Sequence, residues 1–145
     1  MTVSIQLKGA DELRKYIATL GDKVQQEVGK EVMAVALELR TDVIKSVQQG
    51  PASGRVYQKY KPRRVHQASA PGEAPASDTG RLANSIFFDK EGPLTATVGS
   101  LVTYAAHLEY KPSNMGGRPF FRPAVEKMRA DFDKRISAAV ERALR

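Results

Sequence analysis

Residues 22–49 read DKVQQEVGKEVMAVALELRTDVIKSVQQ, and their apolar side chains recur every three or four positions. This spacing places them on one face of an α-helix. At 1.5 Å per residue such a helix is about 40 Å long, which exceeds what a small domain needs for its own core. We therefore expect one long helix that also packs against a neighbouring subunit. Its apolar positions are Val24, Val28, Val32, Val35, Ala36, Leu39, Val43 and Val47.

The residues before this helix predict a strand and a short helix. Val3, Ile5 and Leu7 alternate with polar residues, which is typical of a half-buried strand. From residue 10 the apolar spacing changes to three or four. We expect a short helix from there to about Leu20, followed by a break at Gly21.

Residues 50–80 follow as a segment without regular periodicity. They contain four of the eight prolines and four glycines, and no period of 2 or 3.6 runs through them. A structureless stretch of about 30 residues is normally a functional loop or a segment that a partner orders. We therefore predict an extended, basic, Pro/Gly-rich loop over residues 50–80.

The C-terminal half predicts a hairpin and a second long helix. Residues 82–88 indicate a helical turn that runs into a strand, residues 89–93 (DKEGP) a turn, and residues 94–100 an alternating strand. Residues 102–110 indicate one or two helical turns. Pro123 suits the first turn of a final helix, because apolar residues recur after it at helical spacing.

These elements together predict a single α+β domain over residues 1–145. A length of 145 residues is typical of one domain. Strands and helices are segregated rather than alternating, which argues against a parallel sheet. We expect a small antiparallel sheet of about three strands, packed by the long central helix and a long C-terminal helix. No apolar run approaches the roughly 18 residues of a membrane span, so we expect no membrane partner.

The charge distribution favours a polyanionic partner. The chain carries a net charge of +7, and residues 50–81 and 118–145 each contribute a net +4. Such patches suggest nucleic acid or an acidic protein surface, with a merely solubilising surface as the alternative. The absence of cysteine excludes a disulfide framework, a thiolate nucleophile and a Cys-ligated metal.

The sequence offers no catalytic constellation, and we expect neither an enzyme, a metal nor a cofactor. The two histidines, His66 and His107, lack the spacing of metal ligands. Neither a nucleophile elbow nor a phosphate-binding glycine loop occurs. Glu109 is the one acid in an apolar setting, and we interpret it as a cap or an ion-pair partner. Four acids interleave with basic residues at helical spacing and indicate solvated helix faces: Glu27, Glu31, Glu38 and Asp42.

Two groups of residues are candidates for binding. The stretch RVYQKYKPRR (55–64) mixes five basic residues with two tyrosines, a composition suited to phosphates and to stacking or protein packing. Its basic members are candidates for facing DNA or a channel: Arg55, Lys59, Lys61, Arg63 and Arg64. The candidates for a subunit interface are Tyr57, Tyr60, Arg118, Phe120, Phe121 and Arg122. A solvated loop is the alternative for the first group.

The adjacent pair Phe120 and Phe121 is an unusual feature at a helix start. Both rings cannot easily face the same small core, so we expect one to be buried in its own subunit and the other to fill a pocket next door. The alternative is that both serve their own core. Arg118 and Arg122, four residues apart, are candidate carboxylate partners across an interface.

Three stretches, taken in order, resemble one family. They are Ala70–Ile86 (APGEAPASDTGRLANSI), Ala96–Glu109 (ATVGSLVTYAAHLE) and Arg118–Ala124 (RPFFRPA), the last followed by an amphipathic helix. The series is similar to the small tail-component family of long-tailed bacteriophages and prophages, the neck or tail-completion proteins of head-to-tail joining. The chain departs from the family at Tyr110-Lys111, where members often carry a glycine. Within the first stretch, Asp78 is placed to cap the turn that Thr79 and Gly80 begin.

The resemblance implies a structural role in the virion. Such a protein is a ring-forming subunit, usually six-fold, that helps join the tail to the DNA-filled head and is made in the host cytoplasm. Its partners would be other copies of itself, neighbouring neck, adaptor, tail-tube or terminator proteins, and packaged double-stranded DNA touched only through phosphates. The alternative function is a small basic nucleic-acid-binding protein that acts through non-specific phosphate contacts.

Overall fold

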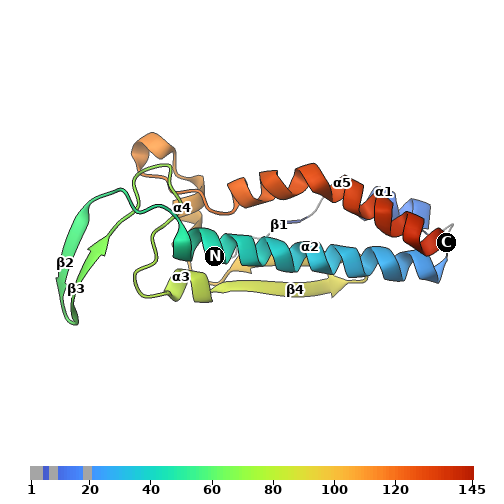
Figure 1. Ribbon diagram of the computed structural model, residues 1–145, viewed down its shortest axis with the longest axis horizontal. Coiled ribbons are helices and arrows are strands. Elements are labelled where there is room, and N and C mark those ends of the chain that lie inside the picture. Colours follow the sequence, from blue (N-terminus) through green and yellow to red (C-terminus); the bar gives the residue numbers. More distant parts are fainter. Residues whose placement is uncertain (1–4, 7–9, 18–20) are drawn as a thin grey trace.

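The computed structural model describes residues 5–6, 10–17 and 21–145, and it has an α+β architecture (Figure 1). The long helix α2 (Asp22–Gln49) has the predicted bounds. It lies between the C-terminal helix α5 (Arg122–Leu144) and a sheet formed by β4 (Ile86–Gly92) and β5 (Thr95–Ser100). The short helices α1 (Ala10–Ile17), α3 (Arg81–Asn84) and α4 (Ala105–Tyr110), with a 3-10 turn η1 (Ser113–Met115), complete the helical elements.

The apolar face of α2 forms the centre of the core. All eight of its predicted positions are buried, and all but Val35 belong to one core cluster with Leu82, Ile86, Val98 and the two phenylalanines of residues 120–121. Full burial of such side chains contributes about 1.5–3 kcal/mol each relative to exposure, an upper bound because denatured chains bury some apolar area already. The helix α2 thus packs against both the sheet and α5.

The hairpin of β4 and β5 is antiparallel, as predicted, with Ile86 opposite Ser100 and Phe88 opposite Val98. β4 extends to Gly92, into the segment expected to be a turn. The pairing register shifts between Lys90 and Gly92, and Gly92 still pairs with Thr95 beyond this shift. On the other edge of β5, the two-residue strand β1 (Ile5–Gln6) pairs antiparallel at Val98 and Thr97. Val3, Leu7 and Leu20, which belong to the predicted strand and short helix, lie outside the described residues.

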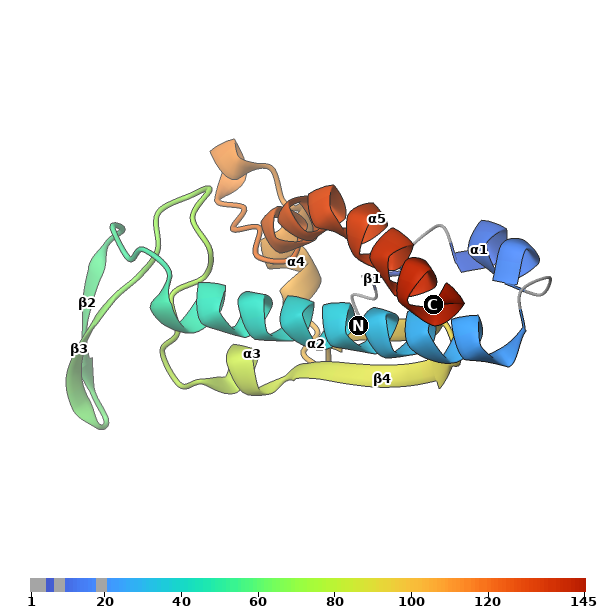
Figure 2. The same cartoon turned by 45° about the vertical axis from the view of Figure 1, so that its right-hand side comes forward.

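The expectation of an extended loop over residues 50–80 is wrong in its first half. Strands β2 (Val56–Tyr60) and β3 (Arg63–Gln67) form a second antiparallel sheet of two strands. The alternation of this hairpin was missed because Val56, Tyr60 and Val65 face solvent while Lys59, Arg64 and His66 face the protein, the reverse of an ordinary half-buried strand. Figures 1 and 2 show it projecting from the end of the body where α2 ends.

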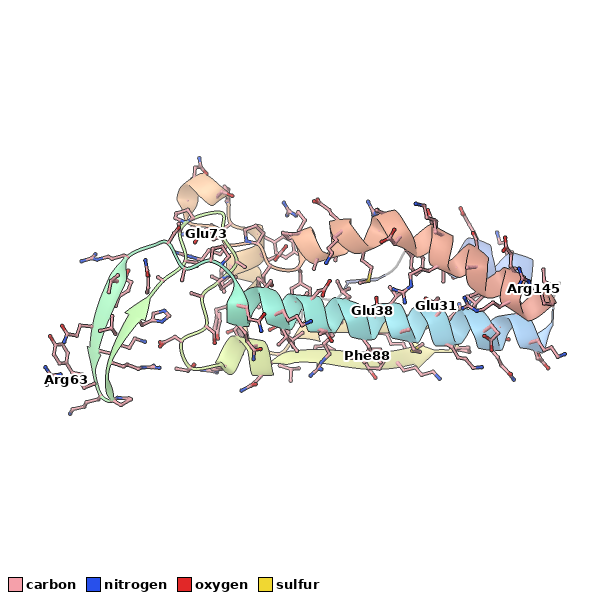
Figure 3. All side chains as sticks on the ribbon, in the orientation of Figure 1. Glu31, Glu38, Arg63, Glu73, Phe88 and Arg145 are labelled. Atoms are coloured by element: carbon pink, nitrogen blue, oxygen red, sulfur yellow. The ribbon has the colours of Figure 1, made fainter. Side chains whose placement is uncertain are left out.

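The helices α2 and α5 are also joined by ion pairs, which corrects the expectation that the acids of α2 are merely solvated. Arg135 donates to Glu31 (2.5 Å) and to Glu38 (2.5 and 2.9 Å), and Lys127 lies 3.3 Å from Asp42. Glu31 and Glu38 lie along the side of α2 that faces α5 (Figure 3). The hydrogen bond from Arg135 holds the pKa of Glu38 below its ordinary value. Pairing across two helices leaves no local sequence signal.

The packing of α2 against the β4–β5 turn predicts the effect of one substitution. A Cβ at Gly29 would lie 2.6 Å from the carbonyl oxygen of Pro93, closer than such atoms approach. We expect Gly29→Ala to lower the free energy of unfolding by about 1–3 kcal/mol, as overpacking does, although alanine favours helices. Denaturant unfolding measures this, with Gln26→Ala on the exposed side of α2 as the control. A more stable Gly29→Ala protein would contradict the observed packing.

Candidate interaction surface

The hairpin of β2 and β3, here called the arm (Val56–Gln67), has two different faces. Cross-strand partners share a face of a sheet, so the pairs Lys59–Arg64 and Tyr57–His66 define the inner face. The inner residues Lys59, Arg64 and His66 are partly covered, whereas every residue of the outer face is exposed. The outer face consists of Val56, Gln58, Tyr60, Arg63, Val65 and Gln67.

Asp78 anchors the inner face of the arm to the body. Its carboxylate forms ion pairs with Lys59 and with Arg64, whose Nη2 lies 2.7 Å from Oδ1. Arg64 also donates to the Asp78 carbonyl at 2.9 Å, and the imidazole of His66 lies 3.8 Å from Oδ1. The expectation that Asp78 caps a turn is therefore wrong, because two cations of the arm take up its carboxylate. The hydroxyl of Thr79 instead accepts from the Arg81 N–H at 3.4 Å.

A second carboxylate, Glu73, holds the base of the arm. It accepts hydrogen bonds from the hydroxyl and the N–H of Ser53, before the arm, and from the N–H of Ala70, after it. These bonds, that of the Ser53 hydroxyl foremost, hold the pKa of Glu73 below its ordinary range. The segments before and after the arm approach each other closely here. A Cβ at Gly54 would lie 2.5 Å from the Ser69 carbonyl oxygen. Glycine is required for this approach.

The predicted DNA-facing residues thus divide into two groups. Lys59 and Arg64 are committed to Asp78. Arg55, Lys61 and Arg63 are exposed, and Arg63 lies at the far end of the arm (Figure 3). The guanidinium of Arg55 stacks 5.5 Å from the ring centre of Tyr57. Tyr60, a predicted interface residue, is 73% exposed.

The predicted interface residues near the start of α5 are mostly used within the chain. Phe120 and Phe121 are both 1% exposed, so the expectation that one fills a neighbour's pocket is wrong. They lie at a loop–helix junction, where the turn of the backbone lets both rings point into one core. The two ring centroids are 4.9 Å apart. Arg118 donates to the Ser69 and Gly116 carbonyl oxygens at 3.1 Å. Arg122 remains exposed.

Glu109 organises this junction, and its interpretation as a cap is confirmed. Its side chain is buried and accepts the N–H groups of Phe120 (2.8 Å), Phe121 (2.9 Å) and Arg122 (2.8 Å). These donors lie at the start of α5, where no intrahelical acceptor exists. A carboxylate there also interacts favourably with the helix dipole. Both of its carboxylate oxygens thus accept hydrogen bonds from the backbone.

A cleft of about 450 Å³ lies between the base of the arm and the body. It is lined by His66, Asp78, Arg81, Tyr104 and Arg118, among others. Asp78, the only carboxylate among the described lining residues, is already paired with the arm. These ion pairs hold the arm against the body.

Among the residues that the structure describes, no group of three or more histidines and acids could hold a metal ion. No described helix combines the length and the apolar character needed to cross a membrane. No protein-family model, curated protein or solved structure matches the chain.

The Asp78 anchor predicts a measurable change in the arm. Asp78→Asn removes the charge that Lys59 and Arg64 share, so we expect the arm to open more often. Hydrogen exchange of amides 56–67 should accelerate about tenfold, equivalent to 1.4 kcal/mol. The control is Asp89→Asn, an exposed acid of β4 without an ion pair among the described residues. Equal exchange rates in both variants would show that the anchor contributes nothing.

Proposed function

We propose that the chain is a structural protein of a phage virion, a ring-forming neck or tail-completion subunit that helps join the tail to the DNA-filled head. The observation that carries the proposal is the arm. A two-stranded hairpin is marginally stable alone, and this one leaves its whole outer face in solvent. An apolar surface of this kind marks an interaction site. A subunit that grips a neighbour in an assembly has a use for such an arm.

The positions of the three family-like stretches support the same proposal. Glu109, which ends the second stretch, holds the backbone of Phe120 and Arg122 in the third. Asp78 in the first stretch anchors the arm. These two carboxylates of the family-like stretches hold other segments of the chain in place, as expected for a structural subunit.

Assembly into a ring would require a heterologous contact that closes by rotation. We propose homo-oligomers, six-fold by the resemblance, with neck, adaptor, tail-tube or terminator proteins above and below. Arg55, Lys61 and Arg63 remain exposed and would contact packaged DNA through phosphates alone if the arm lines the channel.

A second candidate function, non-specific DNA binding as the main role, is favoured by the same exposed cations and by a pI near 9.8. Exposed Lys and Arg that neutralise phosphates release counterions, which makes affinity fall steeply with salt. The two functions differ in whether the free protein binds duplex DNA at moderate salt and in what its loss does to particles.

Loss of the gene provides the decisive test. In lysates of the phage or prophage that encodes the chain, we expect electron micrographs of the deletion to show DNA-filled heads beside unattached or abnormally ended tails. Complementation with the wild-type gene is the control. Normal infectious particles from the deletion strain would overturn the structural function.

A salt titration tests the second candidate. If the arm tip binds duplex DNA, Lys61→Gln with Arg63→Gln should reduce the slope of log K against log salt by about 2, roughly one unit for each lost phosphate contact. Lys134→Gln with Arg145→Gln, which removes one exposed cation from α5 and one from the residue that follows it, serves as the control. The same slope for the arm variant and the wild-type protein would argue against DNA binding by the arm.

A further inference from the structure

The outer face of the arm carries a continuous apolar strip. Val65 pairs with Gln58, which places it diagonally between Val56 and Tyr60 on the same face. Val56 is 57% exposed, Tyr60 is 73% exposed and Val65 is 69% exposed. An exposed strip of this size on a two-stranded sheet calls for a partner that covers it.

The charges of the arm indicate that this partner is a protein. The inner cations Lys59 and Arg64 are turned onto Asp78, and the outer face keeps one cation, Arg63, with Lys61 beside it in the turn. A face built for phosphates would present its cations outward. This face instead presents apolar side chains with positive charge only at the tip.

The solvent face of α5 offers a surface of matching character. Glu126, Asp133 and Glu141 are exposed, and at spacings of seven and eight residues they share one face of the helix. None of them forms an ion pair with the described residues. The small residues Ala130 and Ser137 lie between them. We call Glu126, Asp133 and Glu141 the acidic stripe; the exposed cations Arg122, Arg129 and Lys134 border it.

The dimensions of the two surfaces are compatible. Seven residues of helix span about 10.5 Å, and a strand of five residues spans about 17 Å. An arm laid across Ala130 is therefore long enough for its tip to reach an acid on either side. In Figures 1 and 2 the arm points away from α5 of its own chain, so the two surfaces are available to different copies.

We propose that the outer face of the arm docks on the acidic stripe of a second copy of this chain. Val65 and Tyr60 pack over Ala130, and Lys61 and Arg63 pair with Glu126 and Asp133. This contact deepens the proposed ring function and rests on it. Because each copy carries a net charge of +7, copies repel one another, and a basic tip on an acidic stripe provides local attraction. Donor and acceptor surfaces differ, so the contact is heterologous, as a ring requires.

Cysteine cross-linking tests the contact directly, since the chain has no cysteine of its own. Val65→Cys protein with a size tag is mixed with untagged Ala130→Cys protein and oxidised. We expect a mixed disulfide dimer as the main product. The rival acceptor is the groove of about 700 Å³ between α2 and the β4–β5 turn, which includes Ala34. Val65→Cys mixed with Ala34→Cys therefore serves as the matched control.

Charge reversal supplies a second readout. We expect Arg63→Glu in the Val65→Cys protein to lower the yield of mixed dimer about tenfold, or 1.4 kcal/mol. Asp133→Arg in the Ala130→Cys protein should restore it. Asp131→Arg, an exposed acid of α5 away from the stripe, should not.

Any result other than the mixed dimer of Val65→Cys and Ala130→Cys overturns the proposal. A preference for Ala34→Cys moves the acceptor to the groove, and Val65→Cys dimers alone mean that arms pair with each other. If no cross-link forms, the proposed contact does not exist. The micrographs of the deletion decide the neck function separately, so a ring subunit that assembles through another surface would fail only the cross-linking test.

Discussion

The structure depends on burial of one face of α2. Its valines, from Val24 to Val47, contact the β4–β5 sheet and α5, so neither layer has a core without it. Gly29 brings the β4–β5 turn close on one side, and the ion pairs of Arg135 join α5 on the other. A helix of this length between two layers makes the body a rigid support along its whole axis.

The junction before α5 shows how a buried charge can be structural. Glu109 accepts three backbone N–H groups that would otherwise lack partners, since the first donors of a helix have none within it. Burying a carboxylate is costly unless hydrogen bonds compensate, and here they do. The result sets the position at which α5 begins, and with it the burial of Phe120 and Phe121.

The interactions that hold the arm in place differ from those that hold the body together. It has no apolar core, and side-chain contacts with Asp78 and Glu73 tie it to the rest of the chain. Segments with few buried contacts open most readily, and such segments commonly carry function. Polar anchors that orient an arm while leaving its apolar face free suit a role in assembly, where a second molecule completes the packing.

The sequence by itself determined the helices, the β4–β5 hairpin and the α+β class, because each has a local period. For Glu109, an isolated acid in an apolar setting, it left two roles, a cap or an ion-pair partner. Only the tertiary structure decided the arm and the roles of Asp78, Glu31 and Arg118. Arg64 pairs with Asp78, Arg135 with Glu31, and the Ser69 carbonyl with Arg118; each of these partners lies 14 or more residues away, and a contact across such a distance leaves no periodic trace. The two phenylalanines were misjudged for a related reason: the direction of adjacent side chains depends on the backbone turn between loop and helix, which Glu109 sets from another part of the chain.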